Sequence, residues 1–208
     1  MALNTEKLDK IRTKIIDSAA QRFQRYGYGK TNVAEIACDC GMSAGNLYRY
    51  FKNKSQIAEA IMRLSVDSTI AELRSVVNAP NLTARQRLEE YVLQELYFTH
   101  HQLGTYPTLV EQVRDPSGSG PMLAHDYVEE SHKLLAQILS LGVESGEFVV
   151  SDVHETANVI QAATLMFRYP QLHTDETLEH LETAAQGVIQ LILRALSVAE
   201  SVSMTQAA

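Results

Sequence analysis

The segment Thr31–Ile57, TNVAEIACDCGMSAGNLYRYFKNKSQI, carries two short helical patterns that are separated by a glycine turn. Apolar residues recur in the first pattern with the spacing of one helix face, and Thr31 is its expected N-cap. Gly41 tolerates the backbone of a tight turn, and Ser43 is the expected N-cap of the second pattern. This order predicts a helix-turn-helix followed by the start of a third helix.

The second pattern presents two different faces. Leu47 and Phe51 lie four residues apart and therefore share one helix face, which we expect to point inward. A surface of small, polar and hydroxyl-bearing aromatic residues can approach a DNA groove closely and hydrogen-bond to it. The other positions are of these kinds and predict a recognition helix: Ala44, Gly45, Asn46, Tyr48, Arg49 and Tyr50.

Charge is divided unevenly along the 208 residues, whose net charge is −7. Residues 1–63 contain eleven Lys and Arg against six Asp and Glu, a net charge of +5, and the remaining residues carry −12. Charges often do no more than keep a surface solvated. Because the basic part coincides with the helix-turn-helix pattern, we expect a basic DNA-binding module joined to an acidic one.

Membrane insertion and secretion are not expected. No apolar run approaches the roughly 18 residues of a membrane span, and the polar start MALNTEKLDK lacks a signal-peptide core. Cys38 and Cys40 lie too close for an ordinary disulfide and fit a reducing compartment. We therefore predict a cytoplasmic protein without membrane contact, in which Cys38 is a small buried residue rather than a metal ligand or a thiol switch.

Helical periodicity runs through nearly the whole chain, which predicts an all-α fold of about nine helices. The expected domains are a helix-turn-helix head over residues 1–54 and a body over residues 55–208. Apart from the short helices of the opening motif and one near Pro107, the longer helices are expected to end at Tyr26 and to span Asn53–Val77, Thr83–Leu103, Met122–Ser145, Val153–Tyr169 and Asp175–Leu196.

Residues 10–60 resemble the TetR/AcrR family of bacterial transcriptional regulators. The resemblance implies a homodimer with a three-helix DNA-binding head and a six-helix body. It further implies that a small molecule binds the body and releases the head from operator DNA, so that repression is relieved. The later segment GVESGEF and the apolar helices after it also look like this family. The matching positions in the head are Gly27, Thr31, Ile36, Ala37, Gly41, Ser43, Leu47, Tyr48, Phe51 and Lys54.

If the head docks as the resemblance implies, its contacts divide by chemistry. Thr31, Tyr48, Tyr50 and Lys54 would contact backbone phosphates, which positions the head without reading sequence. Base reading would fall to another set: Ser43, Ala44, Gly45, Asn46 and Arg49. A two-fold protein presents two equal heads, so the double-stranded DNA operator should be a rough palindrome.

In the body, the family resemblance favours a four-helix dimer interface that includes Val159, Ala163, Leu181, Ala185, Val188, Ile189 and Ile192, although these could simply form core. Candidate walls of a pocket for the unidentified effector are Tyr91, Phe98, His101, Tyr106, Met122, Tyr127, Met166 and Phe167. The histidines lack the spacing of a tight ligand motif, so neither a metal site nor a cofactor is predicted.

An enzyme and a regulator that is not released by a ligand are the alternatives. An enzyme is disfavoured because the chain lacks a nucleophile–base motif, a glycine-rich phosphate loop and a paired-carboxylate signature. A DNA-binding regulator whose body only dimerises, or one that activates transcription, remains open as an alternative to a ligand-released repressor.

Overall fold

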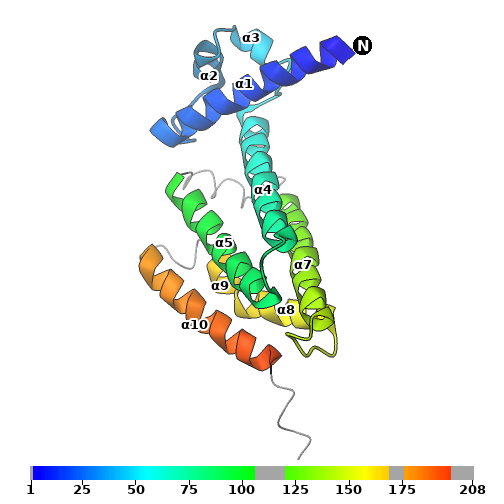
Figure 1. Ribbon diagram of the computed structural model, residues 1–208. Coiled ribbons are helices and arrows are strands. Elements are labelled where there is room, and N and C mark those ends of the chain that lie inside the picture. The colour runs from blue at the N-terminus through cyan, green and yellow to red at the C-terminus, as the bar shows by residue number, and fades with distance from the viewer. Residues whose placement is uncertain (1, 106–119, 169–175, 198–208) are drawn as a thin grey trace, which may run out of the picture. The chain divides into compact units, whose positions relative to one another are not determined.

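The computed structural model describes residues 2–105, 120–168 and 176–197, and every regular element within these ranges is a helix. The prediction of an all-α fold is therefore confirmed. The helices, labelled in Figure 1, are α1 (Ala2–Tyr26), α2 (Val33–Asp39), α3 (Ala44–Leu47), α4 (Lys54–Asn78), α5 (Ala84–Thr105), α7 (Gly120–Glu144), α8 (Val153–Ala163), α9 (Leu165–Arg168) and α10 (Leu178–Leu196).

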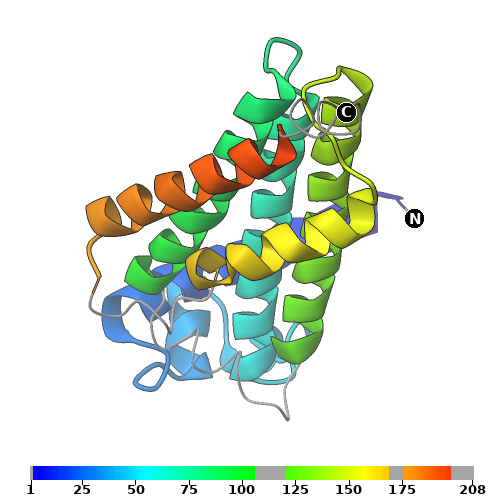
Figure 2. The ribbon, with the colours of Figure 1, turned by 90° about the horizontal axis from the view of Figure 1, so that it is seen from below.

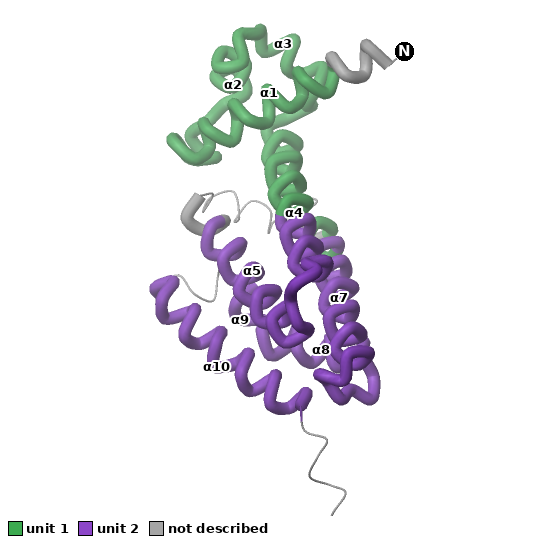
Figure 3. Tube along the Cα trace, in the orientation of Figure 1, with its two compact units in different colours: residues 1–68, 102–125 green, residues 69–101, 126–208 purple. Residues whose placement is uncertain are grey.

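The chain forms two compact units, which are coloured separately in Figure 3. Unit 1 comprises residues 1–68 and 102–125, and unit 2 comprises residues 69–101 and 126–208. Helix α4 contributes to both units, because the first of them extends to residue 68. The expected end of the head at residue 54, where α4 begins, stays a prediction.

Unit 1 is built around one apolar core to which the first four helices all contribute. Ile15 from α1, Ile36 from α2, Leu47 from α3 and Ile57 from α4 are each 0% exposed. Burying side chains of this size stabilises a fold by about 1.5–3 kcal/mol each. The two short helices α2 and α3 are therefore held on α1 and α4 by shared burial rather than by their own length.

Helix caps decide where the short helices of unit 1 begin. Asn32, not the predicted Thr31, is the N-cap of α2, and it forms a capping box with Glu35. Ser43 caps α3 as predicted, because its hydroxyl accepts from the Asn46 amide at 3.2 Å. Asn53 likewise caps α4, as predicted. The turn between α2 and α3 contains Gly41 at φ +67°, a left-handed conformation that favours glycine.

The recognition helix is shorter than predicted. The α-helix ends at Leu47, and the chain continues as a tight turn in which the Arg49 amide donates to Asn46 and the Tyr50 amide donates to Leu47. Gly45 and Asn46 are weak helix formers, and neither favours elongation. Tyr48, Arg49 and Tyr50 therefore project from a turn rather than from a regular helix.

Unit 2 contains the second part of α4, most of α5 and α7, and all of α8, α9 and α10. In Figure 2, α8 in yellow and α10 in orange both cross in front of the bundle that contains α5 and α7. Phe148 packs back after the α7 turn at Gly146, as predicted; it is 2% exposed and its amide donates to the Gly142 carbonyl at 2.9 Å. A Cβ atom on Gly142 would lie 2.0 Å from the Phe148 ring, so glycine is needed for this contact.

Three further predictions need correction. The single helix expected over Val153–Tyr169 is interrupted at Thr164, whose hydroxyl turns back to donate to the Ile160 carbonyl at 2.8 Å. Thr177 caps α10, whereas the predicted start at Asp175 lies outside the described residues. Cys38 is exposed rather than buried, and Cys40 occupies the apolar position in its place.

Candidate functional site

The segment Ser43–Tyr50, named here the α3 segment, presents its polar side chains outward from unit 1. Tyr48 is 50% exposed and Arg49 is also exposed, while the buried Leu47 between Asn46 and Tyr48 anchors the segment to the core. Asn46 and Tyr50 are half-buried. The structure therefore brings together, on one rigid surface, the residues that the sequence predicted as base readers and two of those predicted to contact phosphate.

Thr31 and Lys54, the other two predicted phosphate contacts, make hydrogen bonds within unit 1. Thr31 is 3% exposed, and its hydroxyl donates to the Gly27 carbonyl at 3.0 Å. The Lys54 ammonium donates to the carbonyls of Tyr28 and Thr31, both at 2.7 Å, and lies 4.1 Å from the centre of the Tyr28 ring. Burial lowers the pKa of Lys54 below its usual value. Both side chains hold the chain between α1 and α2. Thr31 is buried and Lys54 is half-buried, and a direct phosphate contact by either stays a prediction.

Arg12 is a residue of the head that the sequence analysis missed. Its guanidinium lies over the Phe51 ring, 4.3 Å from the ring centre, and donates to the Tyr50 carbonyl at 3.3 Å. Arg12 on α1 therefore holds the end of the α3 segment. No motif signals this role, because the contact joins residues that are 38 positions apart.

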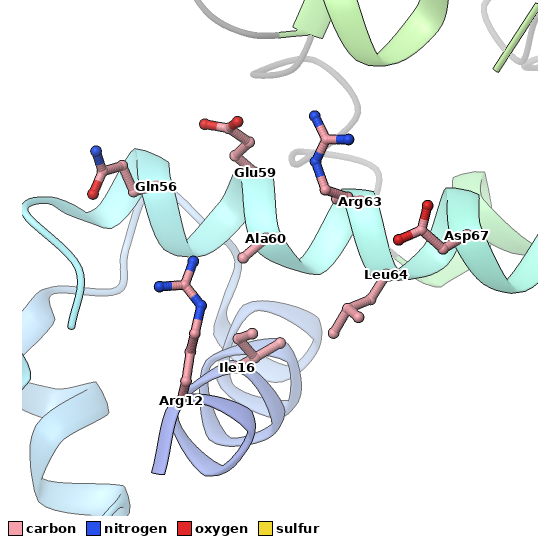
Figure 4. Close-up of a pocket in the computed structure, with 8 residues that line it drawn as sticks. All are labelled: Arg12, Ile16, Gln56, Glu59, Ala60, Arg63, Leu64 and Asp67. Carbon is pink, nitrogen blue, oxygen red and sulfur yellow. The ribbon is translucent and has the colours of Figure 1, made fainter. Parts of the chain in front are cut away.

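Beside Arg12, a cavity of about 360 Å³ lies between α1 and α4 (Figure 4). Ile16, Ala60 and Leu64 supply its apolar surface. The charged side chains around it have both signs, so the cavity favours neither an anion nor a cation. The charged side chains that line the cavity are Arg12, Arg63, Glu59 and Asp67.

Helix α10 carries two apolar stripes with helical spacing. The first is buried within the protomer, where Leu181 is 4% exposed and Ala185 and Ile189 are 0% exposed. These three residues were predicted at the dimer interface. They are instead buried inside the protomer, where they form core and do not reach a partner. The second stripe faces outward or is half-buried, with Leu191 66% exposed, and it contains Ala184, Gly187, Val188, Leu191 and Ala195.

Helix α8 shows a similar division. Ala157 and Ile160 are buried, whereas Val159 is 58% exposed and the small residues Ala162 and Ala163 are also exposed. Among the predicted interface residues, Val159 and Ala163 therefore stay on the surface of unit 2, and Val188 and Ile192 on α10 are half-buried. Exposed apolar side chains on two neighbouring helices are typical of a surface that meets a partner.

The residues predicted to line a ligand pocket are only partly brought together. Tyr91 and Tyr127 meet in unit 2, and the Phe98 ring lies 5.9 Å from the Tyr127 ring. Phe167 is fully buried, His101 and Met166 are exposed, and Met122 is 56% exposed and belongs to unit 1. Tyr106 lies outside the described residues.

Tyr91 and Tyr127 surround a buried carboxylate, Glu95, which is 1% exposed. Its Oε1 atom lies 3.4 Å from the Tyr91 hydroxyl and 3.2 Å from the Tyr127 hydroxyl, and its Oε2 atom lies 3.9 Å from Nε of Arg168. Burial raises the pKa of Glu95 to about 7, although the Arg168 charge opposes the shift. Glu95 lies four residues after Tyr91 and therefore shares the inward face of α5. An acidic residue on an apolar helix face is the sequence feature that could have indicated this buried carboxylate.

A pH-dependent stability follows from this carboxylate. Its pKa is higher in the folded protein than in the unfolded chain, so the stabilisation from protonation is complete at low pH and is lost as pH rises through about 7. Relative to Glu95→Gln, which cannot ionise, the wild-type free energy of unfolding should fall by about 3 kcal/mol between pH 4.5 and 8. Urea unfolding across this range measures the difference, with Glu90→Gln on the exposed face as control. A difference that does not change with pH would contradict the assignment.

None of the described helices is long and apolar enough to cross a membrane. Within the described residues, no three His, Cys, Asp or Glu side chains gather closely enough to hold a metal ion. His132 and His154 stack on each other, with their ring centres 5.6 Å apart.

Comparison with known proteins agrees with the helix-turn-helix geometry. Residues 15–61 match the model for bacterial regulatory proteins of the tetR family, and residues 84–189 match the tetracyclin repressor-like C-terminal domain. The second match alone spans half of the chain. The HTH-type transcriptional repressor KstR2 of Rhodococcus jostii is 27% identical over 140 residues, which cover 66% of this chain and 67% of that protein.

Solved structures share the fold. A transcriptional regulator from Cytophaga hutchinsonii aligns with a TM-score of 0.73 and 22% identity, over 88% of this chain and 96% of that one. FadR of Bacillus subtilis, solved with stearoyl-CoA, aligns with a TM-score of 0.65 and 20% identity, over 87% and 97% of the two chains. At these identities the structures show the fold alone, whereas the family-model matches show descent. The chain belongs to the TetR family and is a DNA-binding transcriptional regulator, not an enzyme.

Proposed function

We propose that this protein is a repressor that binds a palindromic operator as a homodimer and leaves it when a small molecule binds unit 2. The observation that carries the proposal is the α3 segment, whose polar side chains are exposed or half-buried on a core that fixes their backbone. A rigid segment of this kind can hold a constant register on DNA, which sequence-specific binding requires.

The proposed contacts follow from the exposed chemistry of the segment. Tyr48 and Tyr50 donate hydroxyl hydrogen bonds to backbone phosphates, which position the head. The Asn46 amide hydrogen-bonds to the edge of an adenine, and the Arg49 guanidinium hydrogen-bonds to the edge of a guanine. The part of the segment that comes closest to the bases consists of Ser43, Ala44 and Gly45. Thr31 and Lys54 support DNA binding indirectly, because their polar groups hold the turn before α2.

The proposed dimer interface uses the outward apolar stripe of α10 together with the exposed face of α8. Two such helices from each protomer form a four-helix contact, and the small residues on both helices permit close approach. The interface comprises Val159, Ala162, Ala163, Ala184, Gly187, Val188, Leu191, Ile192 and Ala195. Two-fold symmetry then presents two equal heads and requires an operator with two equal half-sites.

Control by a small molecule is supported by relatives that were solved with ligands, among them FadR with stearoyl-CoA and RolR with resorcinol. In this chain, unit 2 contains a buried polar cluster around Glu95, and we propose that the small molecule binds there.

Genomic footprinting of the purified protein tests the proposal. We expect protected sites with palindromic half-sites near promoters, and increased transcription of the adjacent genes when the gene for this protein is deleted. A fall in transcription on deletion would indicate an activator and would contradict repression. Protection without sequence preference would contradict the proposed reading by the α3 segment.

A further inference from the structure

The polar cluster of unit 2 contains a buried cation whose donors are incompletely used. The Arg168 side chain is 5% exposed. Its Nη2 atom donates to the Gln161 carbonyl at 2.7 Å, but Nε and Nη1 have no hydrogen-bond partner among the residues that the structure describes. Glu95 Oε2 is 3.9 Å from Nε, beyond hydrogen-bonding distance. A buried guanidinium with open donors is costly, because it has lost its hydration without full replacement.

The groups around Arg168 cannot supply the missing acceptor without cost. Glu95 is already contacted by the hydroxyls of Tyr91 and Tyr127, which come from α5 and α7. The side-chain amide of Gln161 donates to the Ser131 hydroxyl at 3.1 Å. The Gln161 side chain is therefore engaged with Ser131 and does not serve as an acceptor for Arg168. Arginine stays charged under all ordinary conditions, so its need for an anion persists.

Aromatic rings surround the carboxylate that faces Arg168. The hydroxyls of Tyr91 and Tyr127 reach Glu95, and the half-buried Phe98 ring packs beside Tyr127. Phe167, which precedes Arg168 in the chain, is fully buried. One guanidinium balances one negative charge, and the nearby Glu95 disfavours a doubly charged ligand such as phosphate. A single planar carboxylate on an apolar body matches both the charge and the surroundings.

We propose that Arg168 binds the carboxylate of an apolar organic acid, and that this acid is a class of effector for the protein. The proposal rests on the ligand control proposed above and names the chemistry of the ligand. The acid's carboxylate accepts hydrogen bonds from the open donors of Arg168, and its apolar body lies against the neighbouring aromatic rings.

Binding of such an acid should take up a proton. Two carboxylates beside one guanidinium repel each other, and Glu95, whose pKa is about 7, is the group able to accept a proton from solvent. The pKa values of Tyr91 and Tyr127 are raised well above 10, so both hydroxyls stay neutral donors. Affinity for the acid should therefore weaken about tenfold per pH unit above pH 7.

Calorimetric titration of the full-length protein without DNA tests this inference. The probes are 4-phenylbutyrate and decanoate, with 4-phenylbutan-1-ol and decan-1-ol as uncharged counterparts, at pH 6 and pH 8. Both acids are ionised at both values, so a change in affinity reports on the protein. We expect each acid to bind at least about tenfold more tightly than its alcohol at pH 6, and to take up about one proton at pH 8.

Variants assign the effect to named side chains. Arg168→Gln should remove the preference for acid over alcohol, whereas Arg74→Gln, an exposed arginine of the same unit that pairs with Glu130, should leave it unchanged. Glu95→Gln should abolish the pH dependence and tighten acid binding at pH 8 by about tenfold. This second variant keeps the test decisive if Arg168→Gln fails to fold.

Equal affinity for acid and alcohol in the wild type would overturn the inference. So would absence of acid binding, a preference that survives Arg168→Gln, or a pH dependence that survives Glu95→Gln. The outcome is separable from the proposed repressor function, because footprinting on DNA does not depend on these probes. A protein that still protects palindromic sites but ignores the acids would refute the ligand class alone.

Discussion

Combined replacement of Tyr48 by Phe and Arg49 by Ala should weaken operator binding by at least about 100-fold, because one phosphate contact and one base or phosphate contact are lost in each of two heads. Both side chains are exposed, so the fold of unit 1 should be preserved. Fluorescence anisotropy with an operator fragment at fixed salt measures the loss, and circular dichroism checks the fold.

Arg25→Ala is the matched control for charge. Arg25 is an exposed arginine of the same unit, but it lies at the end of α1 and its guanidinium contacts Tyr26. Its removal should change affinity only slightly. Lys54→Ala is unsuitable as a contact variant, since it would also release the carbonyls of Tyr28 and Thr31. Undiminished affinity of the double variant would show that the α3 segment does not dock as proposed.

Leu191→Glu combined with Val159→Glu should dissociate the homodimer, raising its dissociation constant by at least about 100-fold, because four unpaired carboxylates would be buried in the proposed contact. The two side chains are 66% and 58% exposed in the protomer, so the protomer itself should remain folded. Analytical ultracentrifugation measures the change, and operator affinity should fall with it.

Two substitutions on α10 serve as references for this experiment. Gln190→Glu places a charge on the exposed polar side of the helix and should leave the dimer intact. Ile189→Glu places a charge on a residue that is 0% exposed and should unfold the protomer. A variant of Leu191 and Val159 that remains dimeric would move the interface to another surface.

Local features of this chain could be predicted from its sequence. The helix-turn-helix follows from the caps at Ser43 and Asn53 and from Gly41, which act over three or four residues. The inward positions Ile36, Leu47 and Phe51 follow from helical spacing. Even locally, two polar candidates can compete, as at the start of α2, where Asn32 rather than Thr31 is the cap.

What only the tertiary structure decided is which groups meet across the fold. The sequence by itself determined an all-α chain with a basic head and a family signature, because period, caps and charge are properties of neighbouring residues. It could not choose between the two apolar stripes of α10, since each has the spacing of a buried face and only packing against other helices selects one. Nor could it pair Lys54 with the turn before α2, or Arg168 with Glu95, because long-range burial alone brings these charges together.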